Sequence, residues 1–197
     1  MNFYYKRFDT PFGESIIASV EGKVCWLSFK DDGSMFKEFI EDYICVVVSA
    51  KMKRNFNLFK ERYAPIARKI VSKNYKVIEA NNDLDHSLEL IQKYFKGNKV
   101  NFNEIETVYL EGTPFQRKVW DALKTIEYGK YKSYKEIAKR VEAPGAYRAV
   151  GSANGKNYIP LIIPCHRVIN ADGSLGGYSG GLDIKKKLLE IEEIKIN

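Results

Sequence analysis

The first thirty residues arrange apolar and polar side chains in the short alternating runs that are typical of β-strands. Three such runs cover residues 3–8, 14–20 and 23–29, and the pair Glu21-Gly22 supplies a turn between the last two. We therefore expect an antiparallel meander at the start of the chain. A further run over residues 75–79 predicts one more strand.

Further along, apolar positions recur every three or four residues, which is the spacing of a helix with one buried face. The pattern predicts helices over residues 57–72 and 84–95, and Gly97 suits the C-cap of the second. No repeat or long flexible linker divides the chain. Where the local signals change, we place a boundary between an N-terminal domain of residues 1–105 and a C-terminal domain of residues 106–197.

Two capping boxes mark helix starts in the C-terminal half. Thr113 with Gln116, and Ser133 with Glu136, have the spacing at which side chain and backbone cap each other. A third short helix is expected over residues 146–153, after a turn that contains a Pro-Gly pair. Three short helices with a tight turn before the last are typical of a helix-turn-helix unit.

The remaining pattern predicts a buried strand, a loop and a closing helix. Residues 159–169 are an apolar run that reads as a strand, and residues 170–181 form a turn-rich loop with five glycines. An amphipathic helix starts at Leu182, with Lys185, Lys186 and Lys187 on faces other than the apolar one. The whole pattern indicates an α/β protein.

Composition narrows the class of protein. A chain of 197 residues that is 45% apolar is long enough to bury a core. The three cysteines are scattered, which favours a reducing intracellular compartment, and the N-terminus lacks the pattern of a secretory signal. The longest strongly apolar run, residues 44–48, is too short to span a bilayer. We expect a protein of the cytoplasm, or of the nucleus in a eukaryote.

Charge is unevenly distributed along the chain. The net charge is +7, and residues 117–156 hold ten Lys or Arg against four acidic residues. Such a local basic excess is the footprint of a protein that neutralises backbone phosphates. Charge alone leaves open the alternative of an ordinary solvated surface.

One short segment carries candidate chemistry. Cys165 is followed by His166 and Arg167, and cationic or imidazole neighbours lower a thiol pKa from about 8.5 and make the thiolate a nucleophile. On a strand, however, neighbouring side chains face opposite ways, so a bridging water or a break in the strand is required. A buried structural thiol is the alternative. Arg167 needs an acidic partner, and Glu192 is the candidate for it or for His166.

The segment PCHRVI, preceded by RAVGSANGKNYIPLI and followed by GGYSGGLDIKKKLLEIE, resembles the O6-alkylguanine-DNA alkyltransferases, or methylated-DNA–protein-cysteine methyltransferases. The likeness runs from about Gly112 to Glu193, and more weakly through TPFGESIIAS and LIQKYFKGNKVNF. Residues 34–80 match no motif. The resemblance implies an N-terminal ribonuclease-H-like antiparallel sheet with helices and a C-terminal winged-helix-like (helix-turn-helix) domain.

The resemblance also implies roles for five residues around the thiol. Cys165 would accept the alkyl group irreversibly, with His166 as its base through a water molecule. Glu192 would orient the imidazole, and Asn157 would hold the turn near the cysteine. Tyr134 would lie by the flipped guanine and a neighbouring phosphate, and would help neutralise the leaving oxygen.

For DNA, the resemblance implies that Arg148 enters the base stack and fills the space that the extruded guanine leaves. Its helix would dock in the minor groove through small residues, namely Ala146, Ala149, Gly151 and Ser152. The guanine pocket would be lined by Val168, Tyr178, Ser179 and Gly180. Two departures from the family pattern, Tyr158 in place of a proline and Tyr147 in place of a small residue, affect the turn shape and the DNA contact.

The sequence therefore predicts a DNA-repair protein that takes the alkyl group from O6-alkylguanine in double-stranded DNA onto Cys165, once per molecule. We expect a monomer that needs no cofactor and no metal, because Cys25, Cys45 and His86 are too widely spaced for a zinc site. One alternative is a non-catalytic winged-helix protein that senses alkyl lesions, although sensor relatives lack the acceptor cysteine. A cysteine hydrolase is the other, and it would turn over repeatedly.

Overall fold

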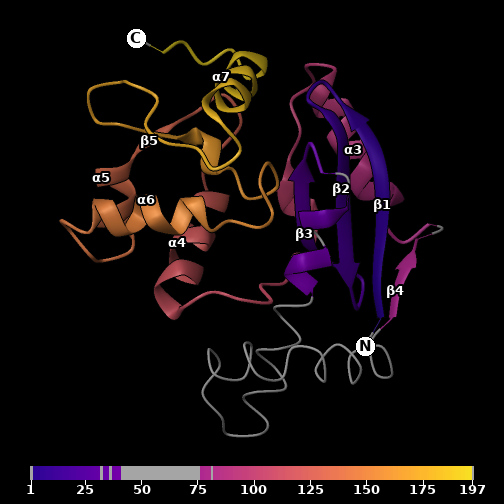
Figure 1. The fold of residues 1–197 in the computed structure, drawn as a ribbon. Coiled ribbons are helices and arrows are strands. Elements are labelled where there is room, and N and C mark those ends of the chain that lie inside the picture. The colour runs from indigo at the N-terminus through magenta and orange to yellow at the C-terminus, as the bar shows by residue number, and fades with distance from the viewer. Residues whose placement is uncertain (1, 32, 36, 41–75, 81, 197) are drawn as a thin grey trace, which may run out of the picture.

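The computed structural model describes residues 2–31, 33–35, 37–40, 76–80 and 82–196. Three features of the sequence lie outside these residues: the helix predicted over 57–72, the apolar run 44–48, and Cys45. The described part is a mixed α/β structure with a sheet on one side and a group of helices on the other (Figure 1).

The first three strands form the predicted antiparallel meander. They are β1 (Asn2–Thr10), β2 (Gly13–Val20) and β3 (Lys23–Phe29). Glu21 and Gly22 join β2 to β3 with positive φ angles of 51° and 75°, the combination that a tight two-residue hairpin turn requires.

The fourth strand corrects the expectation of a purely antiparallel sheet. Strand β4 (Lys76–Glu79) lies beside β1 but runs parallel to it, in the order β3-β2-β1-β4. A parallel neighbour needs a long connection that returns to the same end of the sheet, and the long stretch of chain between β3 and β4 allows one.

Helix α3 (Asp85–Phe95) covers one face of this sheet (Figure 1). It buries Leu90, Ile91 and Tyr94, which lie on one helical face. Gly97 has a φ of 83° and donates its N–H to the Tyr94 carbonyl oxygen at 2.9 Å, so the predicted glycine end of the helix is confirmed.

Three short helices make up most of the second lobe: α4 (Pro114–Lys124), α5 (Tyr134–Arg140) and α6 (Tyr147–Gly155). The structure confirms both predicted capping boxes, Thr113 with Gln116 and Ser133 with Glu136. Helix α5 ends at Arg140, before the Pro144-Gly145 pair that was expected to stop it.

The predicted strand over 159–169 is wrong for most of its length. Pro160 pairs with Ile163 in an isolated bridge, and Cys165–Arg167 forms a turn of 3₁₀ helix, η2. Proline lacks the N–H that a strand interior needs, and Leu161 adopts a φ of 71°, so the chain turns back on itself. Only β6 (Val168–Ile169) is extended, paired in parallel with β5 (Lys132–Ser133).

A single large cluster of buried apolar side chains joins the two lobes. It includes Ile17 and Leu27 of the sheet together with Ile91 of α3, Leu123 of α4 and Leu188 of α7 (Leu182–Ile191). The short 3₁₀ helix η1 (Phe102–Glu104) lies where the chain passes between the lobes. The domain boundary after residue 105 stays a prediction. No helix in the described ranges is both long enough and apolar enough to cross a membrane.

Candidate active site

Cys165 lies at the bottom of a pocket of about 470 Å³ on the helical lobe, which we call the acceptor pocket. Helices α5 and α6 contribute Tyr134, Tyr147, Arg148, Gly151, Asn154 and Gly155 to its lining. The turn Cys165–Arg167, which we call the acceptor turn, and the loop that follows it contribute Cys165, Asn170, Gly177, Tyr178 and Ser179 to the lining. Cys165 is only 4% exposed, so a reacting group reaches it only through this pocket.

Asn157 holds the turn that carries the thiol. Its Nδ2 donates to Cys165 Sγ at 3.2 Å and to the Ile163 carbonyl oxygen at 2.8 Å, and its Oδ1 accepts from the Ile159 N–H at 3.0 Å. One buried amide thus fixes the backbone before the cysteine and gives the sulfur a hydrogen bond that favours the thiolate. The placement agrees with the role that the family resemblance implies for Asn157.

Glu192 lies behind the acceptor turn and accepts bonds from both candidate partners. His166 Nε2 is 2.8 Å from Glu192 Oε1, while Arg167 donates from Nε to Oε2 at 2.9 Å and from Nη2 to Oε1 at 3.0 Å. The Tyr94 hydroxyl donates to Oε1 at 2.9 Å, and the Gly129 N–H donates to Oε2 at 3.1 Å. Sequence reasoning found Glu192 but missed Tyr94, because its only local signal is that of an aromatic residue on a buried helix face.

These contacts define the protonation state of the group. Burial alone would raise the pKa of Glu192, but the hydrogen bonds and charges of His166 and Arg167 lower it to about 2. Burial lowers the pKa of His166, so its imidazole is neutral at neutral pH. A neutral imidazole beside a carboxylate keeps its proton on Nε2, which leaves the lone pair on Nδ1. Nδ1 is buried and makes no hydrogen bond within the part of the chain that the structure describes.

The η2 turn allows Cys165 and His166 to act together, which neighbouring residues of a strand could not do directly because their side chains face opposite ways. Cys165 and His166 are consecutive residues of a 3₁₀ turn, where successive side chains are not directed to opposite faces. The break in the strand that the sequence argument required is therefore present. The thiol and the imidazole belong to one compact turn that ends where β6 begins.

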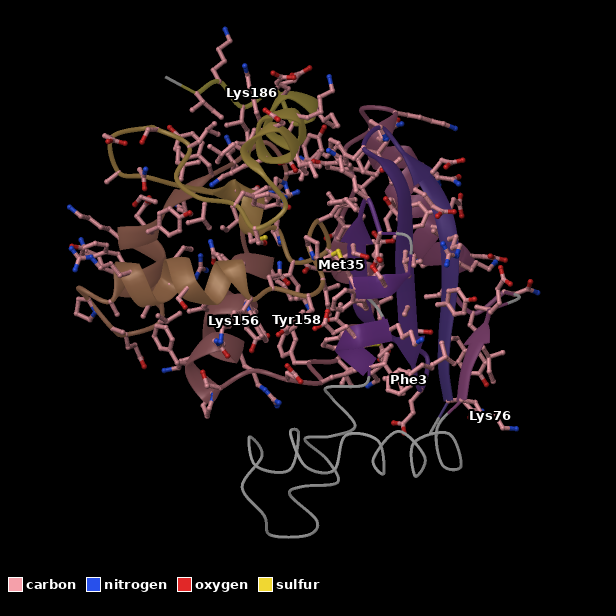
Figure 2. All side chains as sticks on the ribbon, in the orientation of Figure 1. Phe3, Met35, Lys76, Lys156, Tyr158 and Lys186 are labelled. Atoms are coloured by element: carbon pink, nitrogen blue, oxygen red, sulfur yellow. The ribbon has the colours of Figure 1, made fainter. Side chains whose placement is uncertain are left out.

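Lys185 is a charged residue that the sequence placed on another face of the helix, and the structure corrects this. It is fully buried, and its Nζ donates to the carbonyl oxygens of Val168 at 2.7 Å, Gly177 at 3.3 Å and Leu175. The neighbouring Lys186 extends outward from α7 (Figure 2). The signal was available, because Lys185 has helical spacing to Leu182, Leu188 and Leu189.

The surroundings of the Cys165 thiol shift its pKa in both directions. Burial raises the pKa of Cys165, while the Asn157 hydrogen bond and the Lys185 charge lower it. Burial in turn lowers the pKa of Lys185 to about 8, and a Cys165 thiolate opposes that change. The thiol is therefore protonated in the resting protein and needs a base to become a nucleophile.

Tyr134 and the glycine-rich loop form one wall of the acceptor pocket. The Tyr134 hydroxyl lies 3.4 Å from the Gly177 carbonyl oxygen, and a Cβ on Gly176 would lie 2.9 Å from the Tyr134 ring. Gly176 also has a φ of 65°, so both space and conformation favour glycine there. Burial and the nearby Cys165 raise the pKa of Tyr134, which keeps its proton at neutral pH.

The candidate guanine-pocket residues lie at two depths. Tyr178 and Ser179 line the acceptor pocket, and burial together with the neighbouring Cys165 raises the pKa of Tyr178. Val168 is fully buried in β6 and does not line the pocket, although its carbonyl oxygen binds Lys185. Gly180 follows the lining residues in the loop.

Helix α6 forms the other wall. Arg148 and Tyr147 are exposed at the edge of the pocket, with the guanidinium carbon of Arg148 6.0 Å from the Tyr147 ring centre. Gly151 lines the pocket one turn further, while Ala149 and Ser152 are exposed and Ala146 precedes the helix as its N-cap. Sequence reasoning missed Asn154, which is buried on the pocket side of the same helix. Among the described residues no group of three metal-ligating side chains occurs.

The chain is similar to the members of one known family. The family model described as "6-O-methylguanine DNA methyltransferase, DNA binding domain" matches residues 114–194. A methylated-DNA–protein-cysteine methyltransferase of Methanosarcina acetivorans is 51% identical over 189 residues, which cover 96% of this chain and 97% of that protein. A protein of the same name from Mycolicibacterium paratuberculosis is 54% identical over 106 residues, and there the match spans 54% of this chain and 63% of the relative.

Among solved structures, OGT of Mycobacterium tuberculosis in complex with DNA is similar to this chain. It has a TM-score of 0.70 and 33% sequence identity, with 96% of this chain and 92% of that chain covered. The O6-methylguanine methyltransferase of the same organism gives a TM-score of 0.68 at 32% identity, covering 99% of this chain and 95% of that one.

Proposed function

Since this chain belongs to the methylated-DNA–protein-cysteine methyltransferase family, we propose that it repairs DNA by moving the alkyl group of an O6-alkylguanine onto Cys165. The observation that carries the proposal is the position of Cys165 at the bottom of the acceptor pocket, with an amide on its sulfur and a neutral imidazole beside it. The product is a thioether, which the exchange chemistry of thiols and disulfides does not reverse. Each molecule therefore acts once.

The proton on the thiol moves first. We assign His166 Nδ1 as its acceptor, through a water molecule, because this nitrogen holds the free lone pair and its partner nitrogen is fixed by Glu192. The Glu192 carboxylate then stabilises the imidazolium, as the third member of a nucleophile-base-orienter chain does. Asn157 and Lys185 favour the thiolate that results.

Alkyl transfer follows as a single displacement. The thiolate sulfur forms a bond to the alkyl carbon as the bond from that carbon to O6 breaks, and the electron pair stays on the guanine. Tyr134, which keeps its proton at neutral pH, is the hydrogen-bond donor that we assign to the leaving oxygen. The guanine anion takes up a proton at N1 from water, which balances the proton that the thiol gave to His166. Guanine is thus restored in the DNA.

The substrate oxygen lies inside a duplex, so the base must be extruded into the pocket at a cost of a few kcal/mol. We assign Arg148, exposed at the pocket edge, to fill the space in the base stack. The small residues of α6, Ala146, Ala149, Gly151 and Ser152, allow the helix to approach the minor groove closely. The similar M. tuberculosis protein was solved in complex with DNA, which supports DNA as the partner.

We assign the first lobe to a ribonuclease-H-like domain and the second to a winged-helix-like domain. Val168, Tyr178, Ser179 and Gly180 are assigned to the guanine pocket, where backbone groups of the loop reach the base edge. The protein would act as a monomer on double-stranded DNA, in a reducing compartment that keeps its thiols free.

A non-catalytic lesion sensor is not favoured. A sensor needs the DNA-binding helices but no acceptor, whereas in this chain Cys165 has the Asn157 amide hydrogen-bonded to its sulfur and is followed by His166, which is bonded to Glu192. A cysteine hydrolase would regenerate its thiol, and the proposed thioether does not.

The test measures guanine restored in a duplex that carries one O6-methylguanine, at several ratios of protein to DNA. The proposal expects the yield of guanine to equal the amount of protein when DNA is in excess. A yield above the amount of protein would indicate a turnover enzyme. No guanine at all, with the duplex bound, would indicate a lesion sensor.

A further inference from the structure

The floor of the acceptor pocket is made by two buried residues. Of the residues that line the pocket, only Cys165 and Asn154 are buried, with 4% and 7% of their surface exposed. All of the other lining residues keep substantial contact with solvent. Cys165 and Asn154 are therefore the two buried residues of one pocket.

The Asn154 side chain is a hydrogen-bonding group without a partner. Neither its Nδ2 nor its Oδ1 makes a hydrogen bond to any described residue, although both atoms are buried. Such groups are uncommon because burying an unpaired amide costs free energy. Among the described residues, three others also have a buried side-chain polar atom without a hydrogen-bond partner, namely Ser19, His166 and Tyr178. Of these, only Ser19 lies away from the segment around Cys165.

The Asn154 side chain does not hold helix α6 in place. It lies on the face of α6 that lines the pocket, one turn after Gly151, and the helix at this point is held by other groups. The Trp120 indole N–H donates to the Ala153 carbonyl oxygen at 2.9 Å, and the Asn157 N–H donates to the carbonyl oxygen of Asn154 at 3.1 Å. Both bonds use backbone oxygens and leave the amide free.

We propose that the Asn154 amide selects the alkyl group, by hydrogen bonding to a polar atom carried on that group. The inference rests on the proposed function and names a substrate class within it: guanines whose O6 substituent ends in a hydroxyl or a carboxylate. Asparagine donates through Nδ2 and accepts through Oδ1, so it satisfies a hydroxyl in either sense. An apolar chain of the same length leaves the amide unpaired, and sites built in this way discriminate against the substrate that lacks the polar atom.

The reaction itself is unchanged. Sγ bonds to the first carbon of the substituent, the bond from that carbon to O6 breaks, the electron pair stays on the guanine, and the guanine takes up a proton at N1. The terminal hydroxyl takes no part in bond breaking. It remains attached to the S-alkyl cysteine, within reach of the amide.

The experiment compares two substituents of the same size in duplex DNA, O6-(2-hydroxyethyl)guanine and O6-n-propylguanine, with O6-methylguanine as the reference. Single-turnover rates are measured for the natural protein and for Asn154→Leu, which keeps the number and branching of the side-chain heavy atoms and removes the amide. The ratio of the hydroxyethyl rate to the propyl rate is expected to fall roughly tenfold in the variant, the effect of one hydrogen bond. The same substitution at an exposed position, Asn103→Leu, is the matched control and leaves the ratio unchanged.

Three results overturn the inference. An unchanged ratio in Asn154→Leu means that the amide does not contact the substituent. An equal loss on all three substrates means that it binds the guanine instead. A large loss of thermal stability means that the amide has a structural partner in the free protein, since replacing an unpaired buried amide by an apolar group is expected to be neutral or stabilising. The proposed function fails separately, if the natural protein transfers no methyl group.

Discussion

At the scale of single residues, the charge on Glu192 organises the candidate site. One carboxylate accepts bonds from the imidazole of His166, the guanidinium of Arg167, the hydroxyl of Tyr94 and the N–H of Gly129. The two cationic or basic partners are adjacent in sequence, so a single acid fixes both sides of the acceptor turn. A buried charge is tolerated only when it is paired in this way.

Glu192→Gln is expected to lower the free energy of unfolding at pH 7 by roughly 3 kcal/mol, because it leaves the buried guanidinium of Arg167 without its counter-charge. The pKa of about 2 in the folded protein lies below the usual 4.5, so Glu192 stabilises the fold above pH 4.5. This stabilisation is lost as the pH falls from 4.5 toward 2. Urea denaturation between pH 2 and 7 measures both effects.

The matched control is Glu190→Gln, an exposed acid on the same helix. Its free energy of unfolding is expected to stay within about 0.5 kcal/mol of the natural protein. Equal stability of the two variants would contradict the assignment of Glu192 as a paired buried charge.

The sequence predicted those site residues whose surroundings can be recognised from neighbouring positions in the chain, and it missed the others. Cys165, His166 and Glu192 were found because the motif and the family resemblance identify them. Lys185 was misplaced because a run of three lysines reads as a polar face, and only three carbonyl groups from other segments reveal its burial. Asn154 was missed because the absence of a hydrogen bond is a property of the folded protein alone.

At the scale of elements, α7 and the glycine-rich loop are tied together by Lys185. Lys185→Met is expected to lower the free energy of unfolding by about 2 kcal/mol, because the carbonyl oxygens of Val168, Leu175 and Gly177 lose their donor. Hydrogen exchange in residues 175–180 is expected to accelerate, since this wall of the acceptor pocket loses its tether. Denaturation and exchange measurements check these points.

Lys186→Met serves as the comparison, because Lys186 extends to the outside of α7 (Figure 2). Exchange rates equal to those of Lys186→Met would show that Lys185 does not hold the loop.

Helix α6 carries the proposed DNA finger. Arg148→Ala is expected to slow alkyl transfer from duplex DNA about tenfold or more, because the extruded base then returns to an unfilled stack. Transfer from a free O6-alkylguanine base is expected to be unchanged, since no extrusion is required. An equal loss on both substrates would place Arg148 in the chemistry and not in base extrusion.

The helices and strands differed in how well the sequence predicted them. Helices α4 and α5 begin where their capping boxes require, because cap chemistry is local to four residues. The strand predicted over residues 159–169 was wrong, because a turn that is buried on all sides has the same apolar composition as a buried strand. The parallel pairing of β4 depends on a long connection and has no local signature.

At the scale of the whole molecule, Tyr158, next to Asn157, joins the helical lobe to the sheet. Its ring stacks on Trp26 at 5.6 Å and lies 4.8 Å from Phe39, and its carbonyl oxygen accepts from the Leu27 N–H at 2.9 Å. Figure 2 shows it between the two lobes. The Tyr158 ring therefore supplies an aromatic contact between the two lobes.

Tyr158→Ala is expected to lower the free energy of unfolding by about 2 kcal/mol, since it removes two aromatic contacts at the junction of the lobes. Tyr158→Phe keeps the ring and is expected to retain most of the stability. Thermal unfolding of both variants measures the difference. If alanine and phenylalanine have the same effect, the ring does not join the lobes.

The central claim is that Cys165 accepts the alkyl group, and intact-mass spectrometry tests it most directly. The protein is mixed with duplex DNA that carries one O6-methylguanine, beside the variant Cys165→Ala. We predict that the natural protein gains the mass of one CH₂ group, on Cys165, saturating at one group per molecule, and that the variant gains nothing. An unchanged mass in a protein that still binds the duplex, or a gain that persists in Cys165→Ala, would contradict the account.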